Sequence, residues 1–374
     1  MTPLGSEIVA MIAADGPISV ERYMRLALSH PRFAYYRSGD PFGASGDFVT
    51  APEISQMFGE LIGLWAADCW DRMGRPERFG LVELGPGRGT LMADALRAAR
   101  IVAGFHTALE VHLVETSEVL RARQRQALAE RDDSIAVPVF WHERFDTVAR
   151  GPLIVIANEF FDALPICQYV RTRGGWRERL VGLDDHGALS FGLSARTEPS
   201  LGLAAPLGAV LEIRPDALTL ARDITLRLVE HGGAALVIDY GHVRQGLGDT
   251  LQAVRKHGFA DPLSEPGETD LTAHVDFATL ALAAREAGAV VHGPMPQGAF
   301  LRALGIEARA QRLNDGAKPP QAAAIDAALA RLTGDGVGEM GALFKAMAIA
   351  DPSLSSPAGF GLPEDDLRIP GRPR

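Results

Sequence analysis

The sequence predicts an α/β protein built around a parallel sheet with helices on both faces. From residue 79 onward, short apolar runs alternate with stretches of helical periodicity. The first apolar run ends in a cluster of glycines at residues 83–90, and a helical pattern follows directly. Strand, turn and helix in this order are typical of βαβ units, which build parallel sheets covered on both faces.

The composition is that of a soluble globular protein. The chain has 374 residues, 47% of them hydrophobic and 22% charged, and a formal net charge of −10. This acidic balance argues against nucleic acid as a partner, because a phosphate-binding face needs clustered Lys and Arg. No apolar run approaches the roughly 18 residues that span a bilayer, so no membrane segment is expected. The two cysteines form no CxxC pair and the N-terminus shows no signal or transit pattern, so we predict a cytoplasmic protein.

The β series is interrupted once, by an inserted lobe. Between residues 165 and 213, three apolar stretches are joined by glycine-containing turns, which predicts antiparallel strands. The predicted parts, in chain order, are an N-terminal helical cap with a covering loop, the first part of the sheet domain, the β insertion, the rest of the sheet domain with a helical insertion, and an extended tail. Their bounds are residues 1–78, 79–164, 165–213, 214–351 with the helical insertion at 297–333, and 352–374.

The N-terminal part contains a long Gly- and Pro-rich loop that ends at a helix start. Loops of this length inside compact domains are often functional, and this one includes Asp47. Thr50 and Glu53 have the spacing of a capping box, and Pro52 suits the first turn of a helix. We predict that this segment closes over a bound cofactor, with Thr50, Pro52 and Glu53 on the cofactor side and Asp47 toward the substrate. A purely capping role for Thr50 and Glu53 is the alternative.

The strongest local signal is the glycine loop Glu83-Leu84-Gly85-Pro86-Gly87-Arg88-Gly89-Thr90. It follows a predicted strand and opens a predicted helix, which is the context that a cofactor loop requires. Gly85, Gly87 and Gly89 let the backbone approach a ligand closely. An acid at Glu83 would repel a pyrophosphate but can pair with the ammonium group of S-adenosylmethionine. The loop therefore resembles the first motif of Rossmann-like methyltransferases, and a purely structural glycine turn is the alternative.

Polar residues also end two further predicted strands. Glu115 follows the apolar run at 109–114, where a carboxylate can accept hydrogen bonds from both hydroxyls of a ribose. Asn158 and Glu159 follow the run at 153–157, at the edge where open α/β sheets bind ligands. We expect Glu115 and Asn158 to contact the cofactor. An exposed strand-end position is the alternative for Glu115.

The candidate catalytic residues are Asn158, Glu159 and Asp162. Methyl transfer to a reactive nucleophile depends on in-line positioning and on electrostatic control of the acceptor. Glu159 and Asp162, three residues apart, can hold a planar guanidinium with two hydrogen bonds. Phe161 can supply an aromatic wall for a cation. A turn cap is the alternative for Asp162, and a core position is the alternative for Phe161.

Three more residues are predicted on the substrate side with less support. Asp239 and Tyr240 lie at the end of another apolar strand, and His274 lies near a predicted helix start. For His274, an orientation into the site and one away from it are equally open. The histidines and cysteines show no ligand spacing, so no metal is expected.

Taken in order, these segments resemble the MidA family, the group that includes the mitochondrial complex I assembly methyltransferase. The most specific stretches are Gly46–Ser55 and Asn158–Pro165, and the similarity spans about residues 15–360. The resemblance implies a seven-strand Rossmann-like class I methyltransferase sheet and S-adenosylmethionine as cofactor. It also implies that the cofactor is held by Gly85, Gly87, Gly89 and Glu115, and that the acceptor lies beside Asn158, Glu159 and Asp162.

We therefore predict a methyltransferase, a transferase that acts on an arginine side chain of a protein substrate. The resemblance implies that this substrate is a respiratory complex subunit and that the role is in complex I assembly. Two alternatives stay open. One is a methyltransferase for a small molecule or another protein nucleophile, and the other is a non-catalytic assembly or binding protein that keeps the cofactor fold. The oligomeric state is left open.

Overall fold

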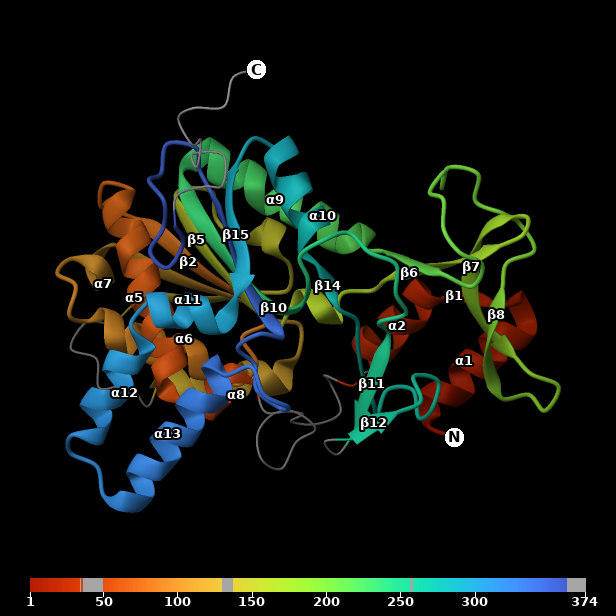
Figure 1. The fold of residues 1–374 in the computed structure, drawn as a ribbon, viewed down its shortest axis with the longest axis horizontal. Helices are drawn as coiled ribbons and strands as arrows, with labels where there is room; N and C mark the ends of the chain where they lie inside the picture. Colours follow the sequence, from red (N-terminus) through yellow and green to blue (C-terminus); the bar gives the residue numbers. More distant parts are fainter. Residues whose placement is uncertain (34, 36–49, 130–136, 256–257, 362–374) are drawn as a thin grey trace. The chain divides into compact units, whose positions relative to one another are not determined.

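The computed structural model describes residues 1–33, 35, 50–129, 137–255 and 258–361 (Figure 1). The chain forms two compact units, each assembled from separate stretches of sequence. The first unit comprises residues 1–49, 161–219 and 244–275. The second comprises residues 50–160, 220–243 and 276–374. Asp47 lies outside the described residues.

The second unit is built around a mixed sheet, which has eight strands in the part of the chain that the structure describes. These are β2 (Phe79–Leu84), β3 (Leu109–Val114), β4 (Val139–His142), β5 (Leu153–Asn158), β10 (Gly233–His242), β14 (Val275–Asp276), β15 (Val290–Pro296) and β16 (Phe344–Ala350). Seven follow the order β15-β16-β10-β5-β2-β3-β4, and the short β14 pairs with β10. The strands β4, β3, β2, β5 and β10 are parallel, as the sequence predicts.

One strand corrects the prediction of a parallel sheet. β16 pairs antiparallel with β10 on one side and with β15 on the other. It is a nearly continuous apolar run, and such a run shows that a strand is buried without showing which way it points. The direction of β16 therefore depends on its pairing with β10 and β15, which no local pattern encodes.

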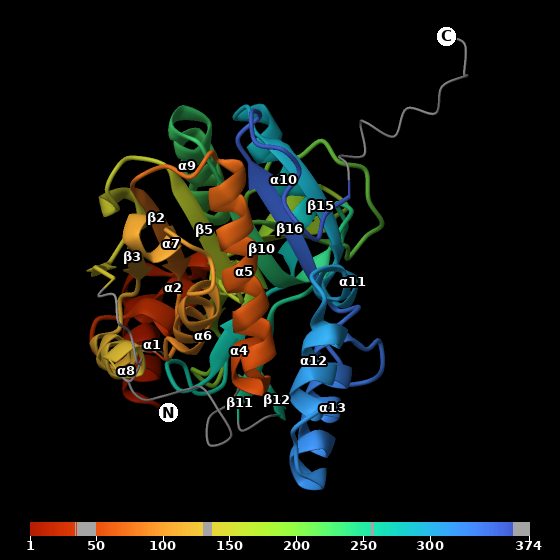
Figure 2. The same cartoon turned by 90° about the vertical axis from the view of Figure 1, so that its left-hand side faces the viewer.

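Helices cover both faces of this sheet. They are α4 (Ala51–Ile54), α5 (Gln56–Arg72), α6 (Thr90–Ala99), α7 (Phe105–Ala108), α8 (Glu118–Ala129), α9 (Pro215–His231), α10 (Phe277–Glu286), α11 (Gln297–Ala303), α12 (Ile306–Asn314) and α13 (Pro319–Thr333). Figures 1 and 2 show α5 and α6 on one face and α9 and α10 on the other. β2 and β5 are buried along their whole length because they lie between these layers.

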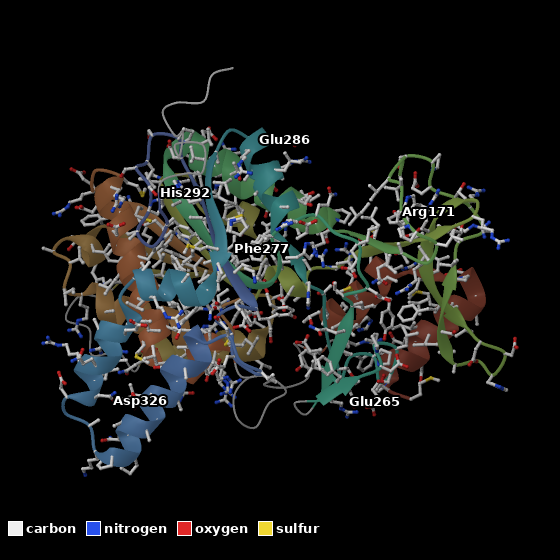
Figure 3. The ribbon with its side chains drawn as sticks, in the orientation of Figure 1. Arg171, Glu265, Phe277, Glu286, His292 and Asp326 are labelled. Carbon is white, nitrogen blue, oxygen red and sulfur yellow. The ribbon has the colours of Figure 1, made fainter. Side chains whose placement is uncertain are left out.

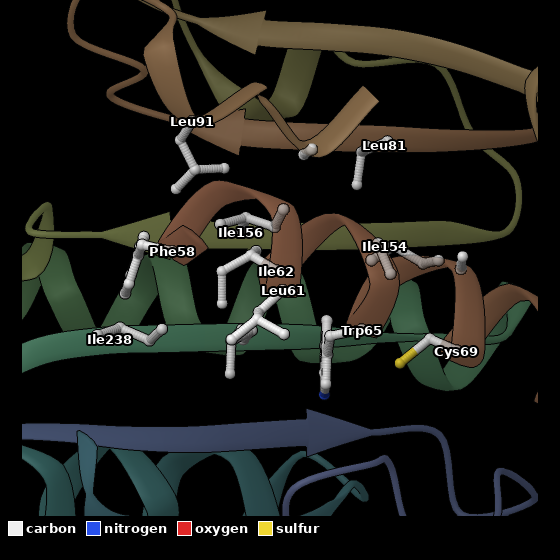
Figure 4. Packing of buried hydrophobic residues seen from close by; sticks show 14 of the residues in the cluster. Phe58, Leu61, Ile62, Trp65, Cys69, Leu81, Leu91, Ile154, Ile156 and Ile238 are labelled. Atoms are coloured by element: carbon white, nitrogen blue, oxygen red, sulfur yellow. The ribbon is translucent and has the colours of Figure 1, made fainter. Parts of the chain in front are cut away.

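The core under α5 follows from its sequence pattern. Phe58, Ile62 and Trp65 are almost completely buried, as the helical spacing predicts. They pack against strand residues that include Ile154 and Ile156 (Figure 4). Burial of such side chains stabilises the fold by about 1.5–3 kcal/mol each.

The helix start predicted near residue 50 leads into two helices, α4 and α5. Ser55 has an extended backbone conformation, and its side chain accepts a hydrogen bond from Met57 N at 3.2 Å, so it caps α5 and ends α4. The side chain of Thr50 makes no capping hydrogen bond. The interpretation of Thr50 and Glu53 as a capping box is therefore wrong, because the carboxylate of Glu53 has another partner.

The first unit combines helices with antiparallel strands. Its helices are α1 (Pro3–Asp15) and α2 (Val20–Ser29). Among the described residues one sheet has five strands, β1 (Ile18–Ser19), β6 (Cys167–Thr172), β7 (Gly175–Leu183), β8 (Leu189–Leu193) and β9 (Val210–Ile213). Another has three, β11 (Gln252–Arg255), β12 (Gly258–Ala260) and β13 (Asp270–Thr272). The antiparallel strands predicted between residues 165 and 213 are present, and β11 to β13 add strands that no local pattern predicted.

The side chains labelled in the second unit differ in burial. In the second unit, Phe277 and His292 are buried, whereas Glu286 and Asp326 are exposed on their helices (Figure 3).

Of the helices described, none has both the length and the apolar character needed to cross a membrane.

A buried ion cluster ties three helices of the second unit together. The carboxylate of Glu60 on α5 accepts hydrogen bonds from Arg97 on α6 at 2.7 Å and from Arg309 on α12 at 2.6 and 2.9 Å. Burial alone would raise the pKa of Glu60, but the hydrogen bonds from Arg309 and Arg97 outweigh it and lower the pKa. α6 begins at the glycine loop, so this cluster fixes the helix on which that loop rests.

We expect Glu60→Gln to lower the free energy of unfolding by about 2 kcal/mol, because it leaves two half-exposed arginines around a buried neutral amide. Urea titration at pH 7 measures the loss. The control is Asp71→Asn, also on α5, which removes an exposed ion pair with Arg75 beyond the helix end and should cost less than about 1 kcal/mol. Equal losses in the two variants would contradict the role of the cluster.

Candidate functional site

The candidate cofactor site lies at the carboxyl ends of β2, β3 and β5. These three strands are aligned in register, with Leu84 beside Val114 on one side and Ala157 on the other. The residues that follow in each strand therefore emerge together at one edge of the sheet. This edge is where open α/β sheets bind ligands.

The glycine loop makes the turn from β2 into α6 with a conformation that suits glycine. Gly85, Gly87 and Gly89 all have positive φ, at 62°, 52° and 85°. A Cβ on Gly85 would lie 2.9 Å from the ring of Phe160, which is closer than real side chains approach. The loop is closed by a hydrogen bond from Gly85 N to Val114 O at 3.0 Å. Backbone conformation and close packing thus both require glycine here.

Glu83 lies inside β2, one residue before the strand ends. It is completely buried, and its Oε2 has no hydrogen-bond partner among the described residues. Burial raises the pKa of the Glu83 carboxyl to about 8. A buried oxygen without a donor fits a cationic ligand group, since the approach of a positive charge favours the ionised carboxylate.

Glu115 follows β3 and is held by its own turn. Its Oε1 accepts a hydrogen bond from Ser117 N at 2.7 Å, and its backbone N–H donates to His142 O at 2.9 Å. Burial raises the pKa of the Glu115 carboxyl, and hydrogen bonds from the backbone and from Gln124 lower it in part. The carboxylate is therefore fixed at the edge of the sheet beside the glycine loop.

Gln124 on α8 is a site residue that the sequence did not indicate. It is completely buried and donates from Nε2 to Gly87 O at 2.8 Å. The residues around it, Arg121 to Arg125, suggest a solvated helix face. Arg123 and Arg125 are exposed, but Arg121 donates to the backbone oxygen of Glu115. A polar helix gives no sign of one inward glutamine.

β5 ends in a sharp turn at Asn158 and Glu159. Glu159 has φ 49°, which is rare for a residue with a side chain and is typical of functional positions. Its Oε1 accepts hydrogen bonds from Ala51 N at 3.0 Å and from Asn158 Nδ2 at 3.2 Å. The buried Oδ1 of Asn158 has no hydrogen-bond partner among the described residues. It fits a donor group on a ligand.

Asp239 on β10 holds this turn from the neighbouring strand. The residue is completely buried, and its Oδ2 accepts a hydrogen bond from Phe160 N at 3.2 Å. Its Oδ1 accepts from Tyr240 N at 2.9 Å. The ring of Tyr240 packs edge-on against Phe344, with ring centres 5.4 Å apart. Asp239 thus supports the backbone that carries Glu159.

The short helix α4 contacts the glycine loop through Glu53. The Oε1 of Glu53 accepts a hydrogen bond from Thr90 Oγ1 at 2.5 Å, and its Oε2 lies 3.7 Å from Arg88 Nη1. Pro52 lies in the first turn of α4, directly after Thr50 and Ala51. The predicted cofactor-side segment therefore meets the loop through one carboxylate.

Other predicted residues belong to the first unit. Phe161 and Asp162 lie in a 3-10 turn, Phe161–Ala163, and both are buried. The backbone oxygen of Asp162 accepts a hydrogen bond from Ala273 N at 3.0 Å. His274 is half-buried, and its backbone N–H donates to Thr250 Oγ1 at 3.0 Å. The burial of Phe161 favours the core position that the sequence left open.

The residues that the structure brings together are Glu83, Gly85, Gly87, Gly89, Glu115, Asn158 and Glu159, with Glu53 and Asp239 behind them. Within the described ranges, no three His, Cys, Asp or Glu side chains gather in a way that could hold a metal ion. Cys69 is buried in α5 and Cys167 is half-buried on β6.

Comparison with known proteins identifies the cofactor class. A family profile of S-adenosyl-L-methionine-dependent methyltransferases matches residues 61–295. The crystal structure of a Burkholderia thailandensis protein bound to S-adenosyl-homocysteine superposes with a TM-score of 0.83 at 31% identity, covering 95% of this chain and 93% of the other. A native crystal structure from the same organism gives a TM-score of 0.81 at 30% identity, over 95% and 93% of the two chains. The fold is thus a methyltransferase-like α/β fold with a mixed sheet, and the cofactor is S-adenosylmethionine.

Curated relatives carry a more specific name. The Danio rerio protein arginine methyltransferase NDUFAF7, mitochondrial, is 39% identical over 82% of this chain and 77% of its own length. The Drosophila melanogaster homolog is 37% identical over 92% and 84%. The Homo sapiens protein is 35% identical over 86% and 77%.

These names correct one prediction. All three relatives are named as mitochondrial, which contradicts the prediction of a cytoplasmic protein. That prediction rested on the missing transit pattern and the sparse cysteines, and neither identifies a compartment.

The resemblance found in the motifs is confirmed, because the family profile covers more than half of the chain and the relatives agree with it. The chain belongs to the MidA family of S-adenosyl-L-methionine-dependent methyltransferases.

Proposed function

We propose that this protein transfers the methyl group of S-adenosylmethionine to an arginine side chain of a protein substrate. The observation that carries the proposal is the geometry of Glu159. Its strained backbone is held by Glu159 N bonding to Ile238 O at 2.9 Å, while its carboxylate is fixed by Ala51 N. A strained residue persists only where its surroundings enforce it, and such positions cluster at active sites.

A carboxylate in this position suits a guanidinium acceptor. The arginine side chain is always charged and offers several donors in one plane, so a fixed carboxylate can both orient and neutralise it. When bound, S-adenosylmethionine supplies a methyl group on a positively charged sulfur. The chain's own part is to align the acceptor nitrogen and to hold the charged guanidinium, which loses one N–H proton as the N–CH3 bond forms and the S–CH3 bond breaks. We propose that Glu159 does this, with Asp162 and Asn158 beside the acceptor.

The cofactor-side roles are proposals of the same kind. We propose that Glu83 faces the ammonium group, that the backbone of Gly85, Gly87 and Gly89 lies along the cofactor, and that Glu115 accepts from the ribose. The orphaned oxygens of Glu83 and Asn158 support this assignment. The segment with Thr50, Pro52 and Glu53 would affect the cofactor through the glycine loop, which Glu53 contacts.

The remaining proposals concern fold detail and substrate. We propose that the seven strands in one path form a class I methyltransferase sheet, with the cap, the insertion and the other divisions as predicted from the sequence. Asp239, Tyr240 and His274 would lie on the substrate side. The names of the relatives support a protein acceptor, and we propose a respiratory complex I subunit and a role in its assembly. The net charge of −10 suits a cationic side chain.

Glu159→Gln should lower methyl transfer roughly 100-fold, because the amide cannot offset the acceptor's charge. The assay uses radiolabelled S-adenosylmethionine and protein extracted from cells that lack this enzyme, followed by hydrolysis to identify methylated arginine. Cofactor affinity should stay within about threefold of wild type. The control is Glu143→Gln, which changes an exposed carboxylate of the same unit. Undiminished transfer by Glu159→Gln, or label on another amino acid, would refute the arginine assignment.

Gly85→Ala should raise the dissociation constant for S-adenosylmethionine tenfold or more, roughly 1.4 kcal/mol, because the new methyl displaces Phe160 and reshapes the loop. Isothermal titration calorimetry measures this constant. Gly74→Ala is the matched control, since Gly74 has φ 80° but no atom within 4 Å of an added Cβ. It should lose about 1 kcal/mol of stability and keep its affinity. Normal affinity in Gly85→Ala would exclude the loop from the cofactor site.

Glu83 should make the fold less stable as pH rises from about 4.5 to about 8. In this range the unfolded chain releases the proton that the buried carboxyl keeps. A rise in pH therefore lowers the free energy of the unfolded state relative to that of the folded state. Glu83→Gln lacks this effect, and its stability relative to wild type should increase over the same range and level off above pH 8. Urea titrations at several pH values test this, since groups common to both proteins cancel. A pH-independent difference would show that Glu83 is ionised in the free protein.

A further inference from the structure

One buried side chain, that of Gln124, contacts both halves of the candidate cofactor site. Its Nε2 donates to Gly87 O in the glycine loop at 2.8 Å and to Glu115 Oε2 at 3.4 Å. Its Oε1 accepts from Trp141 Nε1 on β4 at 2.9 Å. The same residue backs Gly89, where an added Cβ would lie 3.2 Å from the Gln124 Cα.

The chemistry of these contacts fixes which way the amide points. An indole N–H can only donate, so the oxygen of Gln124 must face Trp141. Both amide protons are then directed at Gly87 O and at the carboxylate of Glu115. A carboxylate at position 124 could not donate to either, and an apolar side chain could neither donate nor accept. Glutamine is the side chain that satisfies all three partners.

The hydrogen bond from Gln124 also affects the charge of Glu115. Burial raises the pKa of this carboxyl, and donors from Ser117 N, Thr116 N and Gln124 act against that rise. Among charged groups, Arg121 on α8 lowers it further. On β4, the neighbouring His142 has its imidazole bonded to His112 and to Thr147, at 3.0 Å each. Gln124 is thus the side-chain donor that reaches the Glu115 carboxylate in the described structure.

We propose that Gln124 is a positioning residue that holds the glycine loop and Glu115 in one geometry and keeps the Glu115 carboxylate able to accept both ribose hydroxyls of S-adenosylmethionine. The inference rests on the proposed role of Glu115 as the ribose ligand. Gln124 itself lies behind the loop and makes its contribution through its two partners.

The test measures binding of S-adenosylmethionine by calorimetry from pH 5 to pH 8 with the full chain. Gln124→Leu should weaken binding roughly tenfold or more, the value of a hydrogen bond to a charged group. The pH at which binding is half lost should move upward, because a carboxylate without its donor takes up a proton more readily. Glu83 is present in every variant, so its effect on the pH dependence of binding is common to all of them and cancels when the profiles are compared.

The matched control is Gln297→Leu, because Gln297 is also completely buried and donates to a backbone oxygen, Leu332 O, at 2.9 Å. This variant should lose stability while keeping the wild-type affinity and pH profile. A purely structural role for Gln124 would make the two variants alike. Trp141→Phe provides a second test if Gln124→Leu does not fold, since it removes the group that orients the amide. It too should weaken binding and move the profile upward.

The outcomes separate the inference from the function on which it rests. If Glu115→Gln binds S-adenosylmethionine as well as wild type does, the ribose role of Glu115 is wrong. If Glu115→Gln binds weakly but Gln124→Leu and Trp141→Phe both behave like Gln297→Leu, the role of Gln124 is wrong and that of Glu115 stands. In the Glu115→Gln background, adding Gln124→Leu should cost less than it does in the wild type, because of the two hydrogen bonds from Nε2 only that to Gly87 O is then lost.

Discussion

The shared register of β2, β5 and β3 is the constraint on which the site depends. Leu84, Ala157 and Val114 lie at one level of the sheet, so the residues after them emerge at one edge. Backbone hydrogen bonding sets this level, and each pleat fixes which side chain points to which face. A one-residue slip in any of these strands would move its ligand residues out of this level and turn each of its side chains to the opposite face of the sheet. Strand pairing therefore determines which residues reach the cofactor site, and the side-chain contacts only adjust their orientation.

The motifs that sequence analysis found are those whose signal is local. The glycine loop, Glu115 and Asn158 each follow an apolar run, and a strand end can be recognised without knowing the fold. Features that depend on distant partners were missed. The carboxylate of Glu53 accepts a hydrogen bond from Thr90, which is remote in sequence, so Thr50 and Glu53 form no capping box. Ser55 is the residue that caps α5. The direction of β16 and the inward placement of Gln124 likewise depend on neighbours that no window of sequence contains.

The helix α4 connects the two sides of the proposed reaction. At its start, Ala51 N donates to Glu159, the proposed acceptor ligand, and two residues later Glu53 accepts from Thr90, where the glycine loop becomes α6. Both contacts thus involve one short helix, so a shift of α4 would alter the loop and the acceptor side together.

The position of β16 has a consequence for synthesis of the protein. This strand is the last of the sheet along the chain, yet it lies between β10 and β15 and supplies hydrogen bonds to both. Until residues 344–350 have left the ribosome, those two strands each carry an unpaired edge. Exposed edges of this kind invite pairing with other chains. β10 ends at His242 and β16 begins at Phe344, so the edge of β10 stays open to other chains while about 100 further residues are made.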